Sequence, residues 1–265
     1  MEDLDFLTTY LSPRQIKKLN KQSKKEKTIV QTKSLRGSQQ ISKDNSVTIN
    51  IKELVAKTEN QQKLIDSLET KTCIIARGFA GVGKTRVVTA YAARLFLQRK
   101  IEKIIISRPN VSTGRTLGLL PGSSDDKLTP FCMPMISVLK EYLGESLYEL
   151  ALKRGQIVMQ PIEYIRGQSF SNSFIIIDEC QNLEIEEAKS IITRIGENSK
   201  IAFMGDTKQS DLKHNNGLNF LVDGIMNNKE IYSYSSVIDF TIDDVVRSDL
   251  CAARSEEHTS ELQSR

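Results

Sequence analysis

The sequence has few of the residues that build disulfide scaffolds, zinc sites or membrane spans. Its 265 residues include four cysteines, far apart and without a C-x-x-C pair, and only two histidines. These counts argue against a disulfide framework, a metal site built on cysteine or histidine, and histidine-based triads, and they favour a reducing cytoplasm. No apolar run approaches the roughly 18 residues of a membrane span. The acidic N-terminus MEDLDFLTTY is also unlike a signal peptide, so we expect no membrane association.

Positive charge is concentrated in one segment near the N-terminus. Residues 14–43 contain ten Lys or Arg and one acid, whereas the other 235 residues carry 27 bases and 32 acids. The segment has no aromatics and few large apolar residues, so it buries too little surface to offset the entropy of ordering. We expect residues 1–50 to form a basic, mobile arm. Two roles stay open for it, a sequence-independent contact for nucleic-acid phosphates and a solvated linker.

The other end of the chain differs in character. Residues 254–264 (RSEEHTSELQS) resemble the translation of a sequencing adapter. We therefore expect residues 251–265 to be a non-native tail that plays no part in the fold. Residues 51–250 are then the expected folded domain.

Within that domain, short apolar runs alternate with helical patterns. Runs typical of strands buried on both faces occupy residues 72–77, 103–107, 173–178, 200–205 and 231–235. Apolar residues at helical spacing occupy residues 84–100, 126–143 and 186–196. Strands that alternate with helices need crossover connections, which predicts an α/β fold with a mostly parallel sheet covered on both faces.

The most specific motif is GFAGVGKT at residues 78–85, which fits G-x-x-x-x-G-K-[ST] (Walker A). It follows one expected strand and opens an expected helix, where its glycines let backbone N–H groups surround a phosphate. In such a loop Lys84 reaches the β- and γ-phosphates and the Thr85 hydroxyl ligates Mg²⁺. The candidates for nucleotide binding are Gly78, Phe79, Ala80, Gly81, Val82, Gly83, Lys84 and Thr85.

Two more polar segments follow expected strands. FIIIDECQN places Asp178 and Glu179 at the carboxyl edge of the sheet (Walker B), where open α/β sheets bind ligands. Asp178 suits the Mg²⁺ shell, and Glu179 is the candidate for polarising an attacking water. In MGDTKQSD, Gln209 is either a contact for the γ-phosphate or that water, or an ordinary loop residue. Asp206 in the same segment either caps a loop or joins the site.

Together these segments resemble the PhoH-like family of P-loop ATPases, whose core is related to superfamily 1 helicases. The resemblance covers residues 58–250 through TENQQKLIDSL, GFAGVGKT, RPNVSTGRTLGLLPGSSDDK, PIEYIRGQSFSNSFIIIDECQN, GDTKQSD and DVVRS. It implies binding and hydrolysis of ATP with Mg²⁺ on a three-layer, RecA-like sheet. It also puts Gln61 where a glutamine recognises adenine, and Arg247 where a late arginine stabilises transition-state charge. Arg247 is alternatively a solvated arginine, and Cys180 departs from the alanine usual in the family.

The size of the domain bears on what an ATPase of this kind does. Helicases of superfamily 1 bind ATP between two RecA-like lobes that move against each other. Residues 51–250 are enough for one such lobe. Remodelling of nucleic acid would then need a second subunit, which favours a homo-oligomer such as a ring. We expect an oligomeric ATPase acting on RNA or single-stranded DNA, with Arg108 a candidate contact for nucleotide or polymer. The alternatives are an ATP-binding regulatory module without unwinding and a P-loop kinase, although the acidic and glutamine motifs favour water as the acceptor.

Overall fold

The structure is a computed structural model, and it describes residues 51–109, 124–165, 167–206 and 216–246, without the side chains of residues 124–127. The expected arm, 1–50, and the expected tail, 251–265, lie outside these residues. So do Gln209 and Arg247, whose expected roles therefore stay predictions.

Six strands form one sheet in which all neighbouring strands are parallel, in the order β3-β2-β4-β5-β1-β6. The strands are β1 (Cys73–Gly78), β2 (Lys103–Ser107), β3 (Ile157–Met159), β4 (Ser173–Ile177), β5 (Lys200–Gly205) and β6 (Ser235–Phe240). The parallel sheet of the sequence prediction is confirmed. Strand β4, one of the two central strands, is buried along its whole length, because its apolar residues pack on both faces.

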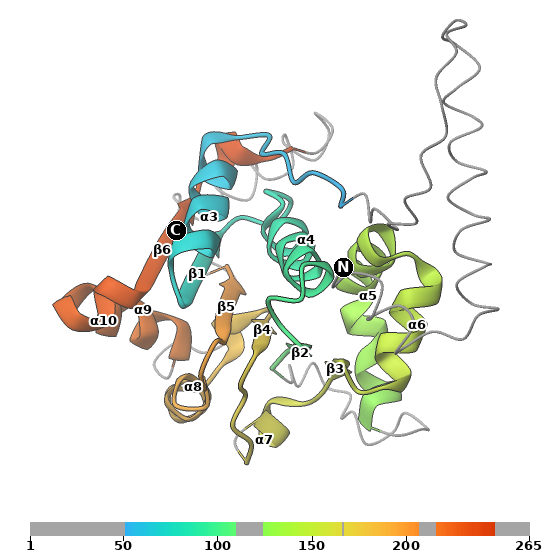
Figure 1. The fold of residues 1–265 in the computed structure, drawn as a ribbon. Coiled ribbons are helices and arrows are strands. Elements are labelled where there is room, and N and C mark those ends of the chain that lie inside the picture. Colours follow the sequence, from blue (N-terminus) through green and yellow to red (C-terminus); the bar gives the residue numbers. More distant parts are fainter. Residues whose placement is uncertain (1–50, 110–123, 166, 207–215, 247–265) are drawn as a thin grey trace, which may run out of the picture. The chain divides into compact units, whose positions relative to one another are not determined.

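Helices cover both faces of this sheet, which gives three layers (Figure 1). One face packs against α3 (Glu59–Thr70), α4 (Lys84–Leu97), α5 (Ser124–Leu143) and α6 (Glu145–Lys153). The other packs against α7 (Ile162–Ile165), α8 (Ile185–Ile192) and α9 (Gly217–Asn227). Successive strand residues alternate between the two cores, as Ile74 and Ile75 do. None of the described helices is both long and apolar enough to span a membrane.

The strand register brings four chain segments to one edge of the sheet. Ile177 of β4 pairs with Ser107 of β2 and with Phe203 of β5, while Arg77 of β1 pairs with Gly205 of β5. The residues that follow these positions therefore leave the sheet side by side at its carboxyl edge. Parallel α/β sheets bind ligands at that edge.

The prediction of a strand at residues 231–235 is wrong. The Asn228 side chain accepts hydrogen bonds from the backbone N–H groups of Glu230 and Ile231, at 3.0 and 3.2 Å, and thereby starts helix α10 (Lys229–Tyr234). Strand β6 begins only at Ser235. The isoleucine and tyrosines of α10 favour strands on propensity, but this helix buries none of its residues, so the local cap decides. The sequence does not predict strand β3, because three residues are too few to show an alternating pattern.

Candidate nucleotide-binding and hydrolysis site

The phosphate-loop motif lies between β1 and α4 and depends on glycine at defined positions. Gly78 has φ +129°, and a Cβ added there would lie 2.2 Å from the carbonyl oxygen of Phe240. Gly83 has φ +87°, and its added Cβ would lie 2.8 Å from Nε2 of Gln61. Any other residue would clash and would also have to adopt a left-handed backbone. The spacing of the motif therefore follows from packing as well as from phosphate chemistry.

Lys84 is buried, at 9% exposure, and points back into its own loop. Its Nζ donates to the carbonyl oxygens of Gly78 and Phe79, at 2.6 and 2.7 Å. Burial lowers the pKa of Lys84, and the negative charges of Asp206, Asp178 and Glu179 oppose that shift. The ammonium thus lies in an acidic surrounding where a phosphate group would compete with backbone carbonyls for it.

The start of α4 is suited to an anion. Gly83 is its N-cap, and no described side chain caps the first N–H groups of the helix. Thr85, in the first turn, is half-buried. Uncapped N–H groups at a helix N-terminus favour negative charge, so this end fits a phosphate.

Asp178 and Glu179 follow β4 directly, as the sequence predicts. Burial, followed by the charge of Glu179, raises the pKa of Asp178 to about 6, whereas the charges of Arg108 and Lys84 work in the opposite direction. Glu179 has φ +54°, a left-handed conformation that is uncommon for a residue with a side chain. That conformation turns the chain from β4 into the short helix η3 (Cys180–Asn182).

Each carboxylate oxygen of Glu179 has its own partner. Oε1 accepts from Nη2 of Arg108 at 3.2 Å, and Oε2 accepts from Nε2 of Gln181 at 2.6 Å. Arg108 follows β2, and its guanidinium lies 5.8 Å from the ring centre of Phe131 on α5. The two partners therefore tie Glu179 to separate parts of the domain.

Gln61 is buried beneath the phosphate loop. Its Oε1 accepts from the backbone N–H of Lys57 at 2.8 Å, and its Nε2 donates to the carbonyl of Val82 at 2.9 Å. Both ends of the amide thus contact backbone, and the contact with Val82 supports the loop. Recognition of adenine by Gln61 stays a prediction.

Thr85 and Asp178 are the candidates for holding Mg²⁺. Within the described ranges no group of three or more His, Cys, Asp or Glu side chains is arranged to hold a metal ion. Mg²⁺ is usually bound by one or two carboxylates together with substrate phosphates. One hydroxyl and one carboxylate near the loop therefore fit an ion that is completed by a nucleotide.

Sequence reasoning overlooked Gln181 and left Asp206 undecided. Asp206 is 6% exposed at the end of β5, and its backbone N–H donates to Oε1 of Gln181 at 3.0 Å. The sequence shows only a glutamine two residues after Glu179. Its contact with Asp206 cannot be predicted without knowing that β4 and β5 are neighbours in the sheet. The structure brings together the phosphate loop, Asp178, Glu179, Asp206 and Arg108.

Comparison with known proteins identifies the family of this chain. A profile of the PhoH-like protein family matches residues 53–257. The chain belongs to this family. Protein PhoH of Escherichia coli (strain K12) is 33% identical over 202 residues, which are 75% of this chain and 56% of that protein. The PhoH-like protein of Bacillus subtilis (strain 168) is 34% identical over 161 residues, 61% of this chain and 50% of that protein. The PhoH-like domain thus spans about half the length of these curated relatives.

Solved structures with a similar fold include the large terminase of a thermophilic bacteriophage. It is 15% identical with a TM-score of 0.47, and the match covers 75% of this chain and 49% of that chain. The UvsW helicase of bacteriophage T4 is 13% identical with a TM-score of 0.42, covering 69% and 60%. The parallel sheet, its covered faces and the phosphate loop after β1 give this PhoH-like chain a three-layer, RecA-like P-loop fold.

Proposed function

We propose that this PhoH-like protein binds ATP with Mg²⁺ and hydrolyses it. The observation that carries the proposal is the position of Glu179, at the carboxyl edge of the sheet and close enough to Lys84 for its charge to act on the ammonium. A carboxylate near the cation of a phosphate loop suits the activation of water. A kinase would instead have to present an acceptor hydroxyl there.

The proposed chemistry divides among residues of this chain. Lys84 exchanges its contacts with the Gly78 and Phe79 carbonyls for the β- and γ-phosphates. Thr85 and Asp178 would hold Mg²⁺, which supplies charge neutralisation for the phosphates. Glu179 accepts a proton from the attacking water.

Two residues outside the described ranges complete the proposal. Gln209 contacts the γ-phosphate or the water. Arg247 stabilises the charge of the transition state.

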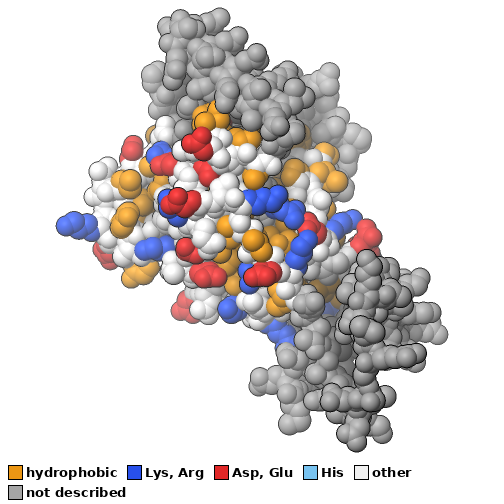
Figure 2. Space-filling view, turned by 90° about the horizontal axis from the view of Figure 1, so that it is seen from above, with side chains coloured by type: hydrophobic (Ala, Val, Ile, Leu, Met, Phe, Trp, Pro, Cys, Tyr) orange, Lys and Arg blue, Asp and Glu red, His pale blue; other side chains and the backbone are white. Residues whose placement is uncertain are grey.

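We further propose that the polymer partner is RNA or single-stranded DNA. Residues 14–43 carry ten bases and one acid, which suits sequence-independent binding of phosphates. On the face shown in Figure 2, basic and acidic side chains of the described part are interspersed. No broad basic surface is seen on the described part of that face, and the base-rich N-terminal segment is our candidate for much of the phosphate contact.

A homo-oligomer, such as a ring, is the third part of the proposal. It is supported by the described residues, which form one RecA-like lobe, and we propose that a neighbouring subunit contributes the surface that closes on it. Arg247 is our candidate for a residue supplied across that interface, and ATPase activity per subunit would then rise with protein concentration. We place the protein in the cytoplasm, in keeping with the free thiols of Cys73, Cys132 and Cys180.

The test measures ATP hydrolysis by the full chain with and without RNA and single-stranded DNA. Lys84→Ala should abolish turnover and greatly weaken nucleotide binding, because it removes the cation that meets the phosphates. Lys63→Ala is the matched control, since Lys63 is an exposed lysine of α3 paired with Glu59. Turnover that survives in Lys84→Ala would contradict the proposal.

One observation favours a second candidate, an ATP-binding regulatory module that does not hydrolyse by itself. Arg108 pairs with Glu179, and this pairing occupies an oxygen that would otherwise accept a proton. In the same assay such a module would bind ATP tightly and show no turnover with any polymer.

A further inference from the structure

Gln181 connects two strand ends at the candidate site. It is 2% exposed, and its amide has a partner at each end, the Asp206 backbone N–H on the oxygen and the Glu179 carboxylate on the nitrogen. The orientation of the amide follows from chemistry. A backbone N–H can only donate, so the amide oxygen faces Asp206 and the NH₂ group is left for Glu179.

The space around Gln181 leaves its amide little freedom. A Cβ added to Gly205, the last residue of β5, would lie 2.7 Å from Oε1 of Gln181. Glycine at this position therefore lets the amide approach the end of β5. A donor held this closely keeps a fixed direction toward the carboxylate it contacts.

Glu179 needs such a support. Its backbone is left-handed, and the turn is closed by a hydrogen bond from the N–H of Asn182 to the carbonyl of Glu179 at 3.0 Å. Its side chain is still partly exposed, so packing alone does not fix the direction of the carboxylate. The contact of 2.6 Å from Gln181 is a charge-assisted hydrogen bond, which is stronger and more directional than a neutral one.

We propose that Gln181 is a positioning residue for Glu179. Its amide is anchored at the end of β5 and holds Oε2 of Glu179, which leaves Oε1 as the oxygen that accepts a proton from water once Arg108 has moved away. The inference rests on the proposed hydrolysis of ATP. It assigns Gln181 no contact with nucleotide, metal or water.

The experiment compares kcat and KM for ATP in two variants. Gln181→Glu keeps an oxygen toward Asp206 but puts a second carboxylate beside Glu179. Gln181→Met keeps the length and loses both hydrogen bonds. Each should lower kcat by about 10-fold or more with little change in KM, because misplacing a reacting group affects turnover rather than ground-state binding. Gln62→Glu is the matched control, since Gln62 lies on the exposed side of α3 and its side chain donates to Asp66, away from the site.

A double variant separates positioning from a general structural role. In a Glu179→Gln protein, Gln181→Glu should lower kcat by no more than about 2-fold, since residues that act as one unit are strongly non-additive. An equal factor in both backgrounds, or a rise in KM that matches the loss of kcat, would overturn the inference. If the Gln181→Met protein does not fold, the near-isosteric Gln181→Glu variant alone tests whether Gln181 positions Glu179. A wild-type protein without Lys84-dependent turnover would instead overturn the proposed function.

Discussion

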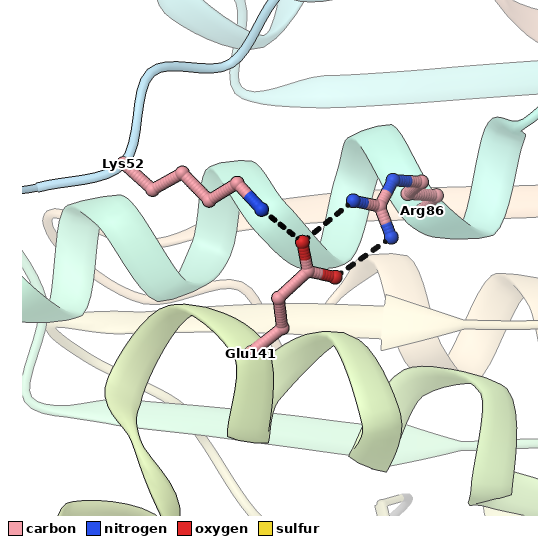
Figure 3. A network of polar contacts seen from close by, with 3 residues as sticks. All are labelled: Lys52, Arg86 and Glu141. Atoms are coloured by element: carbon pink, nitrogen blue, oxygen red, sulfur yellow. Dashed lines mark hydrogen bonds and ion pairs between the residues drawn. The ribbon is translucent and has the colours of Figure 1, made fainter. Parts of the chain in front are cut away.

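Two clusters of opposite charges in this domain use the same chemical groups in different ways. On the outside, Glu141 of α5 accepts from both terminal nitrogens of Arg86 on α4, each at 2.8 Å, and also pairs with Lys52 (Figure 3). At the carboxyl edge of the sheet, the charges of Asp178, Glu179 and Asp206 act on Lys84, whose ammonium donates to the backbone carbonyls of Gly78 and Phe79. In the surface cluster one carboxylate contacts two cations directly, whereas the other cluster gathers three carboxylates near one buried lysine and pairs Glu179 with Arg108.

The pKa shifts of the two clusters have opposite signs. The hydrogen bonds from Arg86 and Lys52 lower the pKa of Glu141 to about 2, whereas burial and the charge of Glu179 raise that of Asp178 to about 6. A lowered carboxyl pKa stabilises the folded protein at neutral pH, and a raised one destabilises it. The contrast indicates that the surface cluster holds α4 to α5, while the buried cluster is kept at a cost in stability, as is common at functional sites.

The largest expected difference between the two clusters is in ATP turnover after a glutamate in each is replaced by glutamine. Glu179→Gln should reduce ATP turnover by about 100-fold or more while ATP still binds, because the amide keeps the shape and loses the proton acceptor. Glu141→Gln is the same chemical change in the surface cluster and should leave turnover within about 2-fold of wild type. Binding is measured by titration with ATP and turnover by phosphate release. Equal losses in both variants would remove the distinction.

A second comparison concerns stability. Above pH 6 the folded protein holds Asp178 ionised against its burial, so Asp178→Asn should stabilise the protein measured without nucleotide or magnesium at pH 8. The expected gain in unfolding free energy is on the order of 2 kcal/mol. Urea denaturation of both proteins measures it. A less stable Asn variant would show that the Asp178 carboxylate contributes interactions that outweigh its burial.

Arg108 offers a smaller effect on activity. Arg108→Ala frees Oε1 of Glu179, so turnover without polymer should rise by roughly 3- to 10-fold, about 1 kcal/mol in activation free energy. Arg86→Ala, which removes the arginine of the surface cluster, is the control and should leave basal turnover unchanged. A fall in basal turnover would mean that Arg108 assists the reaction itself rather than restraining Glu179.

The smallest expected effect is the pH-dependent contribution of Glu141 in the surface cluster to the free energy of unfolding. Because the folded pKa of Glu141 is about 2 and its ordinary value is 4.5, its stabilisation is fully present above pH 4.5 and is lost as the pH falls toward 2. Glu141→Gln should cost about 0.5 to 1 kcal/mol at pH 7, as partly exposed ion pairs do. The difference between the two unfolding free energies should shrink between pH 4.5 and pH 3. A difference that is constant with pH would assign the loss to packing.

Much of the fold was readable from local patterns. The runs that became β1, β2, β4 and β5 are apolar on both faces, and the phosphate loop has a spacing that few other structures require. Local patterns failed where neighbouring signals conflicted. The isoleucine and tyrosines of α10 are typical of a strand, yet Asn228 caps a helix there. Strand β6 begins only after that helix, at Ser235.

The sequence alone determined three features: a phosphate loop, an acidic pair after a buried strand, and a parallel α/β sheet. Each of them has a pattern that lies within short contiguous stretches of residues. Only the tertiary structure decided which side chains meet. Glu179 lies between Arg108 and Gln181, and Gln181 reaches Asp206, because the register of β2, β4 and β5 brings three strand ends to one edge. Such contacts depend on strand order, and strand order is set by how the helices pack on both faces, which no short stretch of sequence contains.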